Sequence, residues 1–114
     1  MNRDELRVAW LEALRSGEYK QGTGVLCNLQ NQYCCLGVLC EVAGVPKEED
    51  KEEGAFTFDG ERAALSQHLT EKVGLYDYLG ISKDGNKCLS ALNDHGVPFS
   101  EIADALETGD YWVE

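Results

Sequence analysis

The stretch from Val25 to Pro46 constrains the fold more than any other, because its hydrophobic pattern changes period midway. In residues 25–29 the side chains alternate between two faces, which is the period of a β-strand. Residues 30–32 are a polar turn, and residues 33–36 can return as the second strand of a hairpin. In either register of a two-residue loop, one face of the hairpin carries Cys27, Leu29, Cys34 and Leu36.

From residue 36 onward the apolar side chains follow the period of an α-helix instead. They recur at spacings of three and four residues, and Gly44 and Pro46 then end the helix. The residues concerned are Leu36, Leu39, Cys40 and Ala43. The sequence therefore predicts a short hairpin that leads directly into a short helix, with small side chains at the junction.

Patterns before and after this centre predict further helices. The first helix opens with Asn2 and Glu5 at the spacing of a capping box and ends at Gly17. A second begins at Thr70 and ends at Gly80, with an inward face of Val73, Tyr76 and Leu79. A third closes at Gly96. A fourth begins at Ser100, with an inward face of Ile102, Ala103 and Leu106.

The fold class follows from these elements together with the chain length. Residues 56–62, FTFDGER, have the pattern of a small strand and turn. At 114 residues the chain has room for one hydrophobic core. We expect an α+β fold: one helix-rich domain over residues 1–114 with one or two short antiparallel β-hairpins, and an acidic mobile loop near residues 47–54.

The charge of the chain is strongly negative and unevenly distributed. The net charge is −11, and residues 47–114 carry six basic against sixteen acidic side chains, a net of −10. This surface repels the phosphate backbone of nucleic acids and attracts a basic partner surface. A role in solubility alone explains the same composition.

The five cysteines are best explained as core residues. Their number is odd and the charged N-terminus is unlike a secretion signal, so a disulfide framework is not expected. Their spacing does not fit a structural zinc site, and no metal or cofactor is predicted. A nucleophile remains an alternative, in which Cys34 or Cys35 would pair with the Asn93-Asp94-His95 triplet.

Two polar segments are the candidate ligand site. YKQGTG offers Tyr19, Lys20, Gly22 and Gly24, and its glycines would let backbone N–H groups approach an anion. LNDHG offers Asn93, Asp94 and His95. Together they predict a pocket for a small anion such as a nucleotide signal. The alternative is that YKQGTG is a turn and LNDHG is a helix end, with no ligand.

The motifs, taken together, resemble a group of small bacteriophage and prophage proteins. The resemblance is carried, in order, by WLEALRSGEYKQGTGVLC, YCCLGVLCEVAG, LTEKVGLYDYLGIS and LNDHGVPFSEIADALE. The chain departs from that group in its acidic insert at 47–53 and in Val97-Pro98. The resemblance implies a phage accessory protein acting in the bacterial cytoplasm, and it carries no catalytic residue with it.

We therefore expect a non-enzymatic protein that inhibits or sequesters a host factor, such as a defence protein. The expected partner is a host protein with a basic surface or a small anionic ligand, with no nucleic acid and no membrane; self-association and a structural role stay open. The alternatives are a nucleotide-signal binding protein and a cysteine-dependent enzyme.

Overall fold

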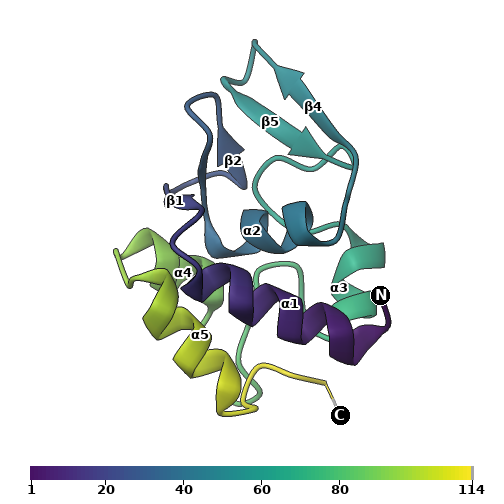
Figure 1. Ribbon diagram of the computed structural model, residues 1–114, viewed down its shortest axis with the longest axis vertical. Coiled ribbons are helices and arrows are strands. Elements are labelled where there is room, and N and C mark those ends of the chain that lie inside the picture. The colour runs from purple at the N-terminus through teal and green to yellow at the C-terminus, as the bar shows by residue number, and fades with distance from the viewer. Residues whose placement is uncertain (114) are drawn as a thin grey trace.

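Helix α2 lies in the middle of the molecule, between a small β-sheet and the remaining helices (Figure 1). The computed structural model describes residues 1–113. The helices are α1 (Arg3–Arg15), α2 (Cys35–Val42), α3 (Gln67–Val73), α4 (Leu89–Asp94) and α5 (Phe99–Glu107). The strands are β1 (Lys20–Gln21), β2 (Cys27–Asn28), β3 (Gln32–Tyr33), β4 (Lys47–Asp50) and β5 (Ala55–Phe58). The predicted helix-rich α+β class is confirmed.

The sheet has the strand order β1-β3-β2-β5-β4. The β1–β3 pair is parallel and the other pairs are antiparallel. Cys27 on the central strand β2 lies opposite Tyr33 on one side and Phe56 on the other. The first predicted hairpin is therefore present, and the second predicted strand, near residue 56, lies beside it.

The predicted shared face of the first hairpin is wrong for its second strand. Strand β3 ends at Tyr33, and Cys34 is already the N-cap residue of α2. Cys34 and Leu36 therefore lie outside the sheet. Residues 35–40 instead belong to helix α2, and all of them are buried there.

The predicted close packing at this junction is confirmed, and Gly37 makes it possible. A Cβ atom added at Gly37 would lie 1.8 Å from the backbone oxygen of Leu26, well inside van der Waals contact. The helix backbone thus rests on the backbone next to strand β2. The same Leu26 oxygen accepts a hydrogen bond from the Cys34 N–H at 3.2 Å.

Residues 47–54, predicted as a mobile loop, instead form a strand and a turn. Strand β4 pairs with β5 from Lys47↔Phe58 to Asp50↔Ala55. Residues 51–54 form the turn, in which the Asp50 carboxylate accepts the N–H groups of Glu52 and Glu53. The charges suggested a loop, but β4 is an edge strand, where charged side chains are common because they discourage further pairing.

Helix α1 follows its predicted pattern. The Asn2 and Glu5 capping box is formed in both directions, at 2.9 and 3.0 Å. Leu6, Trp10 and Leu14 are buried on one face. The Trp10 indole N–H donates to the Cys35 backbone oxygen at 2.9 Å, which joins α1 to the start of α2.

The predicted helix from Thr70 to Gly80 is wrong in its limits. Helix α3 begins after Ser66, whose hydroxyl accepts the Leu69 N–H, and Gly74 ends it at φ 81° in the left-handed region. Val73 is buried as expected. Residues 75–80 form a loop instead of a last helical turn, so Tyr76 and Leu79 are each 40% exposed and do not face inward.

The two C-terminal helices agree with the sequence except at one cap. Helix α4 ends near Gly96 as predicted. Helix α5 buries Ile102, Ala103 and Leu106 as predicted, but its N-cap residue is Pro98 and not Ser100. Proline fits there because its fixed φ suits a helix start and its missing N–H is not needed.

Candidate functional site

The two predicted ligand segments meet in space through one amide side chain. The Asn93 side-chain oxygen accepts hydrogen bonds from Gln21 Nε2 at 2.9 Å and from the Cys35 backbone N–H at 3.1 Å. Its side-chain nitrogen donates to the Gly22 backbone oxygen at 2.8 Å. Asn93 is 0% exposed. The segments are adjacent because a buried amide binds them to each other.

Asn93 also completes the N-terminus of helix α2. The N-cap residue Cys34 makes no side-chain hydrogen bond to the first turn. The first N–H groups of a helix need acceptors from outside it. Asn93 supplies one from α4, a contact between residues 58 positions apart. We call Asn93 and its partners Gln21, Gly22 and Cys35 the Asn93 latch.

The glycine amides that were to bind an anion already have acceptors within the chain. The Gly22 N–H donates to the Tyr33 backbone oxygen at 2.7 Å. The Gly24 N–H donates to the Asp94 carboxylate at 3.0 Å. This carboxylate occupies the position that an anionic ligand would need at Gly24, so the segment is poorly suited to binding one.

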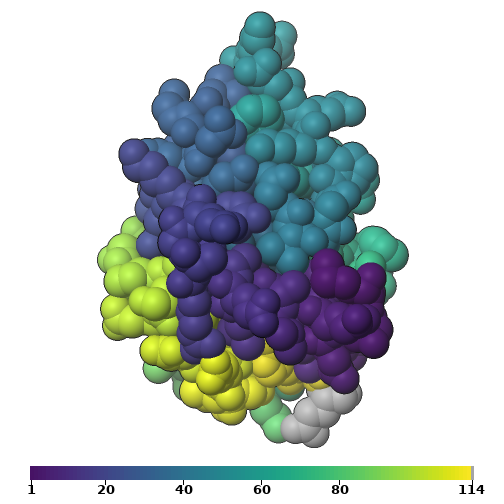
Figure 2. Space-filling view, in the orientation of Figure 1, coloured from purple at the N-terminus to yellow at the C-terminus, as the bar shows by residue number. Residues whose placement is uncertain are grey.

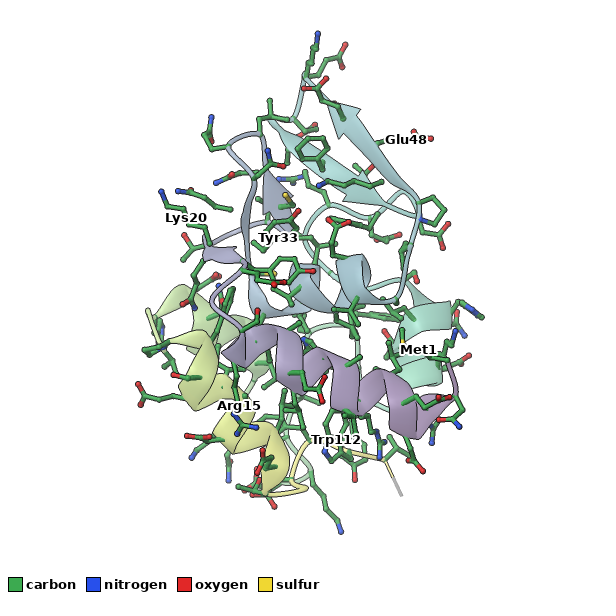
Figure 3. All side chains as sticks on the ribbon, viewed as in Figure 1. Met1, Arg15, Lys20, Tyr33, Glu48 and Trp112 are labelled. Atoms are coloured by element: carbon green, nitrogen blue, oxygen red, sulfur yellow. The ribbon has the colours of Figure 1, made fainter. Side chains whose placement is uncertain are left out.

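The other three candidate residues lie around the latch without converging on a common point. Lys20 is exposed and its side chain extends away from the molecule (Figure 3). His95 is exposed at the end of α4. Tyr19 packs edge-to-face on Tyr33, with ring centroids 5.3 Å apart.

The cysteines have the environment of core residues. All five are free thiols, and Cys88 is the one that is half-buried. Burial raises the pKa of Cys34 to about 11 and that of Cys35 well above its usual value. The nearby Asp94 carboxylate raises the pKa of Cys34 further. A nucleophilic cysteine needs the opposite shift, since the thiolate is the reactive form.

Within residues 1–113, no group of three or more histidine, cysteine or acidic side chains is arranged to hold a metal ion.

No local pattern in the sequence indicates the cluster that surrounds Lys47. Its ammonium donates to Glu41 at 3.2 Å and to the Tyr33 hydroxyl at 3.1 Å, and it lies 4.4 Å from the centre of the Phe56 ring. Burial raises the pKa of Tyr33 to about 12. Each polar group of this cluster has a partner within it, so the cluster stabilises the base of the β4–β5 hairpin.

The β4–β5 hairpin, residues 47–58, carries the densest charge of the chain and forms one end of the molecule (Figures 1 and 2). The side chains of Glu48, Glu49, Glu52 and Glu53 are exposed. Figure 3 shows Glu48 pointing away from the hairpin. We call this element the acidic hairpin.

The arginines, by contrast, are bound by the chain itself. Arg3 and Arg7 donate to backbone oxygens at the end of α3, and the Arg7 guanidinium also stacks on the Trp112 ring at 4.3 Å. Arg15 binds two acidic side chains of α5. Arg62 lies 3.8 Å from Glu53. No described acidic side chain is buried.

Comparison with known proteins places the chain in a family. Residues 1–110 match a family described as a domain of unknown function (DUF8296), and the chain belongs to that family. No curated protein and no solved structure matches it. Over residues 1–113, no helix has both the length and the apolar character required to cross a bilayer.

Proposed function

We propose that this member of the DUF8296 family is a non-catalytic binding protein, and that its acidic hairpin docks on a basic surface of another protein. The observation that carries the proposal is the exposure of the hairpin's glutamates at one end of the molecule. A projecting group of like charges increases the rate of encounter with a surface of opposite charge.

The disposition of the basic side chains supports the same proposal. Arg3, Arg7 and Arg15 bind backbone oxygens or acids of other elements and none of them pairs with the hairpin. Lys47 lies within its cluster at the hairpin base. The acidic hairpin therefore presents its negative charge with Lys51 as the one lysine at its tip.

The resemblance to phage proteins suggests the biological setting of this interaction. In a bacterial cytoplasm during infection, the partner would be a host protein with a basic functional surface, such as a defence factor. The protein would inhibit that factor by occupying the surface, which requires no chemistry from the buried thiols.

Two alternative functions have less support. A small anion at Gly22 and Gly24 would have to displace the acceptors that their N–H groups already bind. A cysteine-dependent enzyme would need a thiolate at Cys34 or Cys35, whose burial favours the neutral thiol.

The test compares two variants of equal charge. The hairpin variant carries Glu48→Gln, Glu49→Gln and Glu52→Gln, and it leaves Glu53 to pair with Arg62. The control variant carries Glu12→Gln, Glu18→Gln and Glu101→Gln, three exposed glutamates outside the hairpin. Each tagged protein is used to capture partners from host cells, and the affinity of the purified partner is measured at several salt concentrations.

We expect the hairpin variant to lose most of the partner and the control to keep it. The affinity of the wild-type protein should fall as salt rises, because exposed charges are screened. Equal binding by both variants, or binding insensitive to salt, would refute docking by the acidic hairpin.

A further inference from the structure

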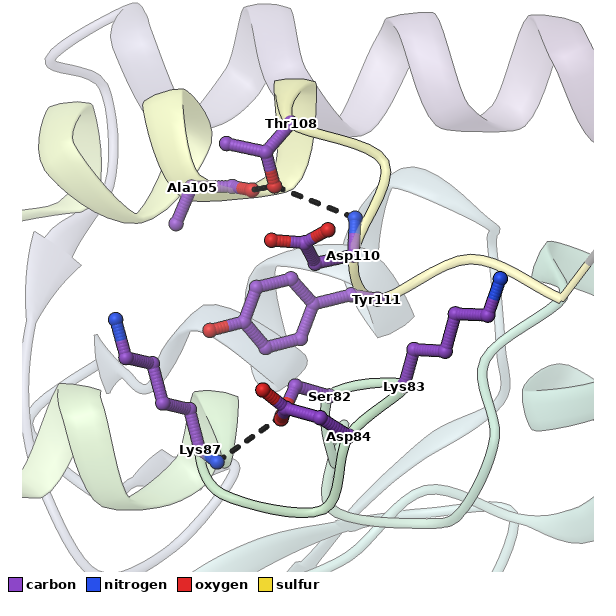
Figure 4. Close-up of a pocket in the computed structure, with 8 residues that line it drawn as sticks. All are labelled: Ser82, Lys83, Asp84, Lys87, Ala105, Thr108, Asp110 and Tyr111. Carbon is purple, nitrogen blue, oxygen red and sulfur yellow. Dashed lines mark hydrogen bonds between the residues drawn. The ribbon is translucent and has the colours of Figure 1, made fainter.

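A pocket of about 420 Å³ lies between the loop of residues 82–87 and the C-terminal end of α5 (Figure 4). It is far in sequence from the acidic hairpin and shares no residue with the Asn93 latch. Its volume is within the range of small-molecule sites. The polar residues that line it include Ser82, Asp84, Lys87, Thr108, Asp110 and Tyr111.

The walls of this pocket are held by a dense set of hydrogen bonds. Ser82 and Lys87 exchange two bonds across the loop, at 2.7 and 3.0 Å. The Asp84 carboxylate accepts the Ser82 hydroxyl at 2.7 Å and the Asn86 N–H at 2.9 Å. The Lys83 N–H donates to the Asp110 backbone oxygen at 2.6 Å, which joins the two walls. The pocket is therefore formed before any ligand arrives.

One polar group in the pocket is left without a partner. Tyr111 is 3% exposed as a residue, and its hydroxyl, which makes no hydrogen bond within residues 1–113, is the part that reaches the pocket. Figure 4 shows this hydroxyl pointing into the pocket, on the same side as the Lys87 ammonium. The hydroxyl is open to water in the pocket, so its capacity to donate and accept hydrogen bonds is unused by the fold. This hydroxyl is therefore available to an acceptor on a ligand.

The charges around the hydroxyl define the ligand further. The carboxylates of Asp84 and Asp110 flank the Tyr111 ring in Figure 4, and Lys87 faces them. An anion alone would meet two carboxylates, and a cation alone would meet two lysines, since Lys83 also lines the pocket. A molecule that carries both charges can pair with each group.

We propose that this pocket binds a small zwitterion with the chemistry of an α-amino acid. Its carboxylate accepts from the Tyr111 hydroxyl and the Lys87 ammonium, and its ammonium donates to Asp84 and Asp110. The proposal is independent of docking by the acidic hairpin.

The experiment titrates the full-length protein with each standard L-α-amino acid, up to about 10 mM, and follows the backbone amide signals by NMR. We expect at least one amino acid to shift the signals of residues 82–87 and 108–111. The N-acetyl and the carboxamide derivatives of that amino acid should each bind at least about tenfold more weakly, because each lacks one charge.

Two matched pairs of variants test the residues. Tyr111→Phe should weaken binding about tenfold and leave the melting temperature unchanged, since the hydroxyl has no partner in the protein; Tyr76→Phe, on an exposed tyrosine, is its control. Lys87→Gln should weaken binding about tenfold, and Lys51→Gln should not.

Three results would overturn the proposal. In the first, no amino acid shifts these signals. In the second, a derivative that lacks one charge binds as well as the parent. In the third, Tyr111→Phe lowers the melting temperature without weakening binding, which would assign the hydroxyl a structural role. The Tyr111→Phe variant should capture the protein partner as well as the wild type does. A failure of the amino-acid proposal can therefore be told apart from a failure of docking by the acidic hairpin.

Discussion

Replacing Asn93 by alanine distinguishes a structural latch from a ligand-binding residue. The sequence offered Asn93 as part of a ligand site, whereas the structure gives its side chain three hydrogen bonds to the chain itself. If Asn93 served a ligand, Asn93→Ala would leave the free energy of unfolding almost unchanged. If it is the latch, the variant must lose stability without any ligand present.

The size of the loss follows from the environment of each partner. Gln21 and Gly22 are half-buried and can recover hydrogen bonds to water, so each lost bond costs about 1 kcal/mol. Cys35 is completely buried, so its N–H would be left without an acceptor at a cost of about 1–3 kcal/mol. The expected total is about 3–5 kcal/mol, a large part of the roughly 5–15 kcal/mol that stabilises a typical domain.

The assay is denaturant unfolding of Asn93→Ala beside Asp94→Ala as the control. Asp94 is exposed, and within residues 1–113 its side chain makes one hydrogen bond, to the Gly24 N–H, so its replacement should change the free energy of unfolding by no more than about 1 kcal/mol. The melting temperature of Asn93→Ala should fall by roughly 12–20 °C. If the two variants were equally stable, the latch would not hold the two segments together.

Three further predictions concern the core. Gly37→Ala should lower the free energy of unfolding by more than about 3 kcal/mol, because the added Cβ would lie 1.8 Å from the Leu26 backbone oxygen. Gly44→Ala should lower it by about 1 kcal/mol, because the site has open space and only its φ of 70° is unfavourable for alanine. Equal losses for the two variants in denaturant unfolding would refute the close packing at Gly37. At neutral pH a thiol reagent should label Cys88 before any other cysteine of the native protein, and rapid labelling of a second site would contradict the burial. Burial raises the pKa of Tyr33 from 10.0 to about 12, so its contribution to stability is complete below pH 10 and is lost as pH rises through 12. Tyr33→Phe should flatten this decline in the free energy of unfolding. An unchanged decline in the variant would show that Tyr33 is not its cause.

Local patterns were sufficient to predict those helices whose capping residues and buried faces are both determined by residues close in sequence. The capping box of α1 joins Asn2 and Glu5, and the inward face of α5 repeats within one helix. The limits of α3 were missed because two signals competed. Ser66 and Thr70 are both good N-cap residues, and the buried loop contacts after Gly74 are made with distant segments, such as the bridge from Leu75 to Trp112.

The acidic strand β4 could not be predicted from its own composition. Residues 47–50 have the charge density of a loop, and they become a strand because β5 supplies a partner backbone and Lys47 reaches the aromatic cluster. Strand formation here is a tertiary effect, as is common for edge strands with weak intrinsic preference.

The candidate site shows why residue type alone is a weak guide to binding. Asn93, Asp94 and the two glycines were chosen because such groups bind ligands, and they do lie together. Their hydrogen-bonding capacity, however, is used by the fold, through contacts between residues about seventy positions apart that no local pattern reveals.

The polar groups that remain free are therefore the better indicators of function in this protein. Hydrogen bonds and ion pairs to the chain itself engage the arginines, Lys47 and the amides of the YKQGTG segment. The glutamates of the acidic hairpin and the hydroxyl of Tyr111 differ from these groups, because the first project into solvent and the second faces a pocket without a partner. A polar group at a protein surface can bind a partner only with capacity that the fold has not used, and both of our proposals place recognition at groups of this kind.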